Sequence, residues 1–126
     1  MQVWNLRAPY ESERAGPRVL FSTPEARGVV IDLAPDEELR EHRVRERAVV
    51  FVVGGSIDLT AAGSTTTCGE GTLVLLEPGE QHTVRAREQS RLLLVLAPWP
   101  APDHYDAGEH EDPHELPANA TQPEGL

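Results

Sequence analysis

The sequence predicts an all-β sandwich or barrel, and two observations support this fold class. Turn signals such as Pro35-Asp36, Gly54-Gly55 and Pro78-Gly79 recur along the chain, which has 10 Gly and 11 Pro among its 126 residues. Between the turns lie short segments rich in β-branched and other apolar residues. Many short strands separated in this regular way are typical of β-sandwiches and β-barrels.

The length predicts one domain with a single core. A chain of 126 residues buries about two-thirds of its unfolded surface when it folds, and it is too short for two ordinary domains. The alternating prolines of residues 97–102 end the last strand. We expect strands over residues 18–21, 29–33, 42–53, 57–61, 65–68, 72–76, 82–87 and 91–97.

Residues 35–50 allow a second interpretation, because Asp36 and the acidic residues after it resemble the start of a helix. The apolar spacing decides between the two. Leu39 and Val44 would lie on different faces of a helix, whereas a strand separates apolar from charged residues by parity. In a strand, one face carries only arginines: Arg43, Arg45 and Arg47.

The same parity directs two of the five histidines inward. His42 lies on the face opposite those arginines, together with small apolar residues. His82 shares its face with Val84 and Ala86, whereas the alternate residues of 82–87 are polar or charged. We therefore expect two imidazoles from distant strands to face one interior.

The charge balance excludes a general role on nucleic acid. The chain has 21 acidic and 11 basic residues, and nucleic-acid binding needs a net basic surface. A membrane partner is also not expected, because the longest apolar runs, residues 48–53 and 92–97, are far below the roughly 18 residues of a membrane span. Residues 1–16 lack the apolar segment of a secretory signal and Cys68 is the only cysteine, so we expect a cytoplasmic protein.

One stretch resembles the second sequence motif of the small single-domain cupins. Gly71, Gly79 and His82 keep the spacings of that motif, whereas its proline falls on Glu77 and its asparagine on Ala86. The first motif is more degraded. It keeps its first histidine and its final glycine, but its second histidine and its glutamate are replaced; the positions concerned are His42, Gly55, Val44 and Ala48.

The resemblance covers about residues 28–98 and implies a small double-stranded β-helix, or jelly-roll barrel. Two of the four family metal ligands remain. Cupins range from dioxygenases and isomerases to storage proteins and sugar-binding regulators, so the resemblance does not name a function.

A small-molecule site in the barrel is the function that we expect. Small apolar residues at the two replaced ligand positions leave space in the lumen, and the two histidines would orient a largely apolar organic ligand. The predicted ligand-binding residues are His42, Val44, Ala48, Val50, His82 and Val84.

A metal-dependent enzyme, such as an oxygenase, isomerase or epimerase, is the alternative. Glu46 has the parity of His42, so His42, His82 and Glu46 would form a two-histidine, one-carboxylate set for Fe, Mn, Ni or Zn. Against this, Glu46 lies among arginines and would then only pair with them on the surface. A third alternative is an interaction module that acts through its outer arginine face.

The chain divides near residue 102 by composition. Residues 103–126 hold 7 acids and no arginine, and we expect an acidic, Pro-containing, partly disordered tail. Residues 1–102 would form the barrel with N-terminal strands and a strap at residues 99–102. The tail also gathers His104, His110 and His114, but such ligands bind metals weakly without a rigid frame.

Several strands are apolar on both faces, so something outside the barrel must cover them. The clearest cases are residues 49–53, 73–76 and 92–96. A second copy of the chain is the simplest cover, and we expect a homodimer in which residues 3–6 or 18–21 add to the neighbour's sheet. The alternative cover is the protein's own N-terminus.

Overall fold

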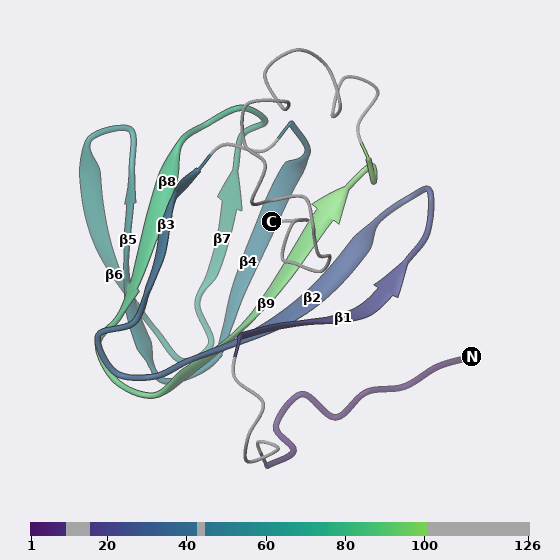
Figure 1. Ribbon diagram of the computed structural model, residues 1–126, viewed down its shortest axis with the longest axis horizontal. Helices are drawn as coiled ribbons and strands as arrows, with labels where there is room; N and C mark the ends of the chain where they lie inside the picture. Colours follow the sequence, from purple (N-terminus) through teal and green to yellow (C-terminus); the bar gives the residue numbers. More distant parts are fainter. Residues whose placement is uncertain (10–15, 43–44, 101–126) are drawn as a thin grey trace.

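Two antiparallel β-sheets form the protein (Figure 1). A computed structural model describes residues 1–9, 16–42 and 45–100, and for residues 40–42 it describes the backbone alone. Within these residues the elements are β1 (Gly16–Ser22), β2 (Arg27–Leu33), β3 (Glu38–His42), β4 (Arg47–Gly54), β5 (Ser56–Ala61), β6 (Ser64–Gly69), β7 (Leu73–Leu76), β8 (His82–Ala86) and β9 (Ser90–Ala97).

The five-stranded sheet has the order β1-β2-β9-β4-β7, and the four-stranded sheet has the order β3-β8-β5-β6. The predicted all-β class is confirmed. The described residues contain no helix, and hence none long and apolar enough to cross a membrane.

The predicted single strand over residues 42–53 is wrong, because the chain changes sheets within it. β3 pairs with β8, whereas β4 pairs with β7 and β9, and residues 45 and 46 form a bend before β4. Residues 43–47 contain neither Gly nor Pro, so the usual sequence signals of a corner are missing.

The helix alternative for residues 35–50 is also wrong. Asp36 has a positive φ of 69° in the turn before β3, and its amide donates to the carbonyl of Ala86 at 2.8 Å. Aspartate tolerates this left-handed conformation better than most residues do. The turn therefore leads directly into an extended strand.

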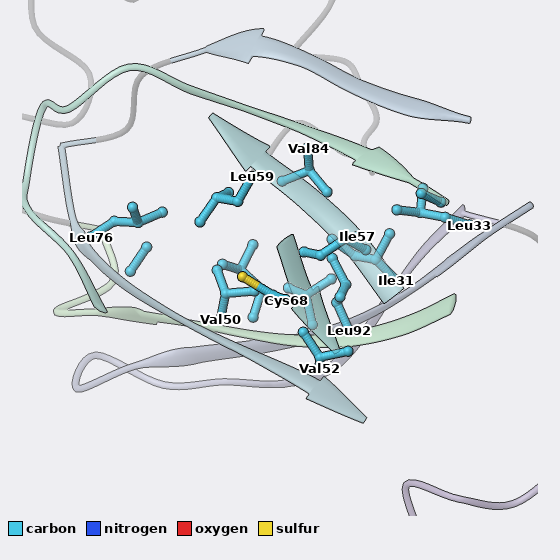
Figure 2. Packing of buried hydrophobic residues seen from close by; sticks show 14 of the residues in the cluster. Ile31, Leu33, Val50, Val52, Ile57, Leu59, Cys68, Leu76, Val84 and Leu92 are labelled. Carbon is cyan, nitrogen blue, oxygen red and sulfur yellow. The ribbon is translucent and has the colours of Figure 1, made fainter. Parts of the chain in front are cut away.

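The core lies between the two sheets. Alternate residues of each central strand point into it, as Val29, Ile31 and Leu33 do in β2. Figure 2 shows apolar side chains from several strands of both sheets converging there, with Cys68 of β6 among them. Burial of such side chains contributes roughly 1.5–3 kcal/mol each and drives the two sheets together.

The N-terminal segment, residues 1–9, contacts the outer side of the five-stranded sheet through residues 4–8. Arg91 of β9 donates to both carboxylate oxygens of Asp32 on β2, at 2.7 and 3.3 Å, and to the carbonyls of Leu6 and Ala8, at 2.8 and 2.7 Å. Residues 18–21, which we expected could add to a neighbour's sheet, belong to β1, which pairs with β2 of the same chain and is an edge strand of its sheet. Their addition to a neighbour's sheet stays a prediction.

Candidate functional site

His82 stands at the start of β8, directly after the turn that contains Pro78 and Gly79. The alternation along β8 buries His82, Val84 and Ala86, as the sequence predicted. His82 is 6% exposed, and its Nδ1 lies 3.2 Å from the carbonyl oxygen of Glu80. A carbonyl only accepts hydrogen bonds, so Nδ1 is the donor in this contact.

A small cavity of about 20 Å³ lies beside this imidazole. It is lined by Ile31, Leu39, Val50, His82, Val84, Leu92 and Leu94. Such a volume is enough for about one water molecule. Among the lining residues that the structure describes, His82 is the one polar side chain, so this part of the cavity is apolar apart from one imidazole.

His42 is the cross-strand backbone partner of His82. The pairing of β3 with β8 shifts between Leu39 and His42, and β3 is the edge strand of its sheet. The side chain of His42 lies outside the described part of the chain, and so does the whole of Val44.

The other predicted pocket residues divide into two groups. Val50 and Val84 line the cavity, whereas Ala48 is buried in the core and is not part of the lining. Sequence analysis missed lining residues on three further strands: Ile31 of β2, Leu39 of β3, and Leu92 and Leu94 of β9. The period-two alternation of β2 and β9 was the signal that identifies their inward faces.

Glu46 is fully buried, with 0% exposure, one residue before β4. It has the parity of Ala48 and Val50, which are core residues. The surface position considered for this carboxylate is therefore wrong. Its role as a metal ligand stays a prediction.

The described residues do not assemble a complete metal centre. They contain no group of three or more His, Cys, Asp or Glu side chains placed to hold one ion. His82 is a lining residue of the cavity, but Glu46 is not. A transition metal usually takes three or four protein donors, so His82 and Glu46 alone would not hold one.

Cys68 and Trp99 complete the surroundings of the core. Burial, and secondarily the charge of Asp58, raises the pKa of the Cys68 thiol, which therefore stays protonated and unreactive.

Trp99 packs against the core, and the Arg27 guanidinium lies 4.3 Å from its ring centre. The remainder of the predicted strap and the histidines of residues 103–126 lie outside the described residues.

Solved structures share this architecture. The conserved SPY1581 protein of unknown function from Streptococcus pyogenes is 23% identical, with a TM-score of 0.67 over 76% of this chain and 86% of that one. An RmlC-like cupin from Desulfovibrio desulfuricans is 17% identical, with a TM-score of 0.69 over 78% and 97%. TT1209 from Thermus thermophilus is 20% identical, with a TM-score of 0.69 over 78% and 98%. At these identities the likeness concerns the fold, which is the predicted double-stranded β-helix.

No curated protein matches the sequence. The family model of the cupin domain matches residues 29–98, close to the span expected from the two motifs. Because this match covers more than half of the 126 residues, the chain belongs to the cupin family.

Proposed function

We propose that this cupin binds a small organic molecule between its sheets, with His82 as the group that orients it. The observation that carries the proposal is one buried imidazole in an otherwise apolar cavity. Ligand sites commonly combine an apolar lining with a few precisely placed polar groups. A hydroxyl or carboxyl group on the ligand would hydrogen-bond to the His82 ring.

His42 is the second imidazole of the proposed site. Directly opposed residues of an antiparallel pair have Cβ atoms about 4.5–5.5 Å apart and share one face of the sheet. The register position of His42 opposite His82 supports this role for a second ring.

Entry of an organic molecule requires the cavity to widen, because its volume of about 20 Å³ suits a single water. We infer that β3 is the wall that moves. It is an edge strand bonded to one neighbour, and its pairing is irregular next to the cavity residue Leu39. Fewer ladder hydrogen bonds break there than at any central strand.

The test is a thermal-shift screen of small organic acids, alcohols and sugars, followed by titration of each hit into variants. His82→Ala should weaken binding about tenfold, which corresponds to loss of one hydrogen bond of roughly 1.4 kcal/mol. Thr83→Ala, on the opposite face of the same strand, is the matched control and should bind as the wild type does. A library without hits, or hits that bind equally to His82→Ala, would contradict the proposal.

A metal-dependent enzyme is a second candidate because a carboxylate, Glu46, is buried on the core side next to β4. Its ligands would be His42, His82 and Glu46. Elemental analysis of untagged protein decides between the two candidates. Stoichiometric metal that is lost in both Glu46→Gln and His82→Ala would replace the ligand-binding proposal with this one.

A further inference from the structure

A second cavity lies outside the core, between the N-terminal segment and the outer side of the five-stranded sheet. It is lined by residues of that segment and of β1, β2 and β9, and we call it the outer cavity. Its volume is about 520 Å³, whereas the cavity beside His82 has about 20 Å³. Ligand sites commonly measure roughly 300–1,000 Å³, so the outer cavity has room for an organic molecule as the structure stands.

Hydrogen bonds hold the N-terminal wall of the outer cavity in place. Asn5 Oδ1 accepts from the Arg7 amide at 3.0 Å, which closes a turn within the segment. Arg91 of β9 donates to the carbonyls of Leu6 and Ala8 at 2.8 and 2.7 Å. These bonds fix the backbone that faces the sheet, so the cavity has a defined shape.

Trp4 places an aromatic ring at the outer cavity. Its ring centre lies 5.8 Å from that of Phe21 on β1, with an angle of 57° between the two ring planes. Phe21 is paired with Gly28 of β2, where an added Cβ atom would come within 2.6 Å of the Phe21 ring. The missing side chain at position 28 therefore lets Phe21 support the indole. Trp4 is 41% exposed, so part of its ring is available to stack against a flat apolar group.

Three arginines line the outer cavity and a neighbouring cavity of about 260 Å³, and two of them have acidic partners. Arg91 pairs with Asp32 at 2.7 Å, and Arg7 pairs with Glu70 at 2.5 Å. Arg18 of β1 is half-buried in the outer cavity, and no carboxylate of the described residues pairs with it. The described lining contains no acidic side chain. The outer cavity thus has one uncompensated positive charge, although the whole chain has a net charge of −10.

We propose that the outer cavity is a second ligand site, which binds a monocarboxylate with a flat aromatic ring. The planar guanidinium of Arg18 matches a carboxylate, because the two groups can form parallel hydrogen bonds. The ligand ring lies against the Trp4 indole and the apolar side chain of Val30. One ligand charge balances one arginine, whereas a dianion would keep a second negative charge without a partner in a half-buried place. This site is separate from the cavity beside His82, so either proposal can fail without the other.

Titration of 2-naphthoate into the ¹⁵N-labelled full chain tests the proposal by NMR. The chain has two tryptophans and therefore two indole N–H signals, which Trp4→Phe assigns. We expect the ligand to shift the Trp4 signal and to leave that of Trp99, which packs against the core, in place. Neutral 2-naphthamide is the matched ligand control. It should bind at least tenfold more weakly, because it forms no charged pair with Arg18.

Two variants test the guanidinium itself. Arg18→Gln should weaken binding of 2-naphthoate at least tenfold and should change binding of 2-naphthamide little. Arg47→Gln removes a positive charge from β4 of the same sheet, at a position outside the cavity lining, and should bind as the wild type does. A urea midpoint close to that of the wild type establishes that Arg18→Gln is folded.

The barrel variant separates the two sites. His82→Ala should bind 2-naphthoate as tightly as the wild type does, and a loss of binding in this variant would place the ligand in the barrel and overturn the proposal. A shift of the Trp99 signal alone would have the same meaning. The proposal is also overturned if the wild type binds no 2-naphthoate at about 1 millimolar, if the two ligands bind equally, or if Arg18→Gln binds as tightly as the wild type.

Discussion

Asp58 lies on the solvent side of β5 and connects three strands through its carboxylate. The Thr67 hydroxyl of β6 donates to it at 2.7 Å, and Arg87, just after β8, contacts it at 3.2 Å. The hydrogen bond from Thr67, together with the charges of Arg87 and Arg85, lowers the pKa of Asp58 below its ordinary value of 3.8. The folded protein therefore favours the ionised carboxylate.

This pKa shift predicts a pH-dependent effect of Asp58→Asn. A carboxylate with a lowered folded pKa stabilises the fold above its unfolded pKa, and that contribution is lost as the pH falls through the folded value. The variant should have a lower urea midpoint than the wild type near neutral pH, and the difference should shrink below pH 3.8. Glu25→Gln, which removes an exposed charge, is the control. A difference that stays constant or grows on acidification would contradict this account.

At the same scale, strand parity predicted the burial of His82 and allowed an inward position for Glu46, whose arginine neighbours suggested the surface instead. Parity could not determine which groups each side chain contacts. The contact of His82 Nδ1 with the Glu80 carbonyl exists only because the turn before β8 folds back. The absence of Glu46 from the cavity lining depends on a change of sheet that no residue in 43–47 signals.

The turn between β4 and β5 is held in place by the side chain of Ser90, the first residue of β9. Gly55 has a positive φ of 89°, and a Cβ atom on it would overlap Ser90 Oγ and the Gln89 carbonyl. Ser90 Oγ accepts from the Ser56 amide at 3.0 Å and contacts the Glu88 carbonyl at 2.7 Å. This hydroxyl ties the two turns together at one end of the molecule.

Two glycine substitutions separate backbone strain from steric overlap. Gly63, between β5 and β6, has a similar φ of 80°, but a Cβ atom added to it would meet no other atom within 4 Å. Gly63→Ala should therefore cost about 1–2 kcal/mol of unfolding free energy from the left-handed conformation alone. Gly55→Ala should cost at least about 2 kcal/mol more, measured by urea denaturation, because overpacking adds to the strain. Equal costs would mean that Ser90 and Gln89 move away from the new Cβ atom at position 55 without loss of stability.

Arg91 links parts of the molecule that are far apart in sequence. Its guanidinium and the Asp32 carboxylate are both buried, and its contact with Leu6 spans 85 positions. A buried ion pair adds little net stability over apolar residues of the same shape, but removal of one partner leaves an uncompensated charge. Arg91 therefore acts as a clamp that joins Asp32 to the carbonyls of Leu6 and Ala8, and it positions the N-terminal segment more than it stabilises the core.

Arg91→Leu should lower the unfolding free energy by about 3–5 kcal/mol, because the Asp32 carboxylate stays buried without its cation. The double substitution Asp32→Leu with Arg91→Leu should recover most of this loss in a urea titration. Both variants should release residues 1–9 to limited proteolysis, since the clamp on two of their carbonyls is gone. If Arg91→Leu lowers the unfolding free energy by less than about 1 kcal/mol, or if the double variant recovers none of the loss, this role of Arg91 is contradicted.

The sequence by itself determined the all-β class, the cupin family and the inward position of His82, because alternation and motif spacing are local patterns. Only the tertiary structure decided that residues 42–53 divide between two sheets, that β1 pairs within its own chain and that Arg91 holds the N-terminal segment. These features depend on which distant strands become neighbours. The packing of the whole barrel determines which strands pair, and the sequence of a single segment does not indicate its neighbours.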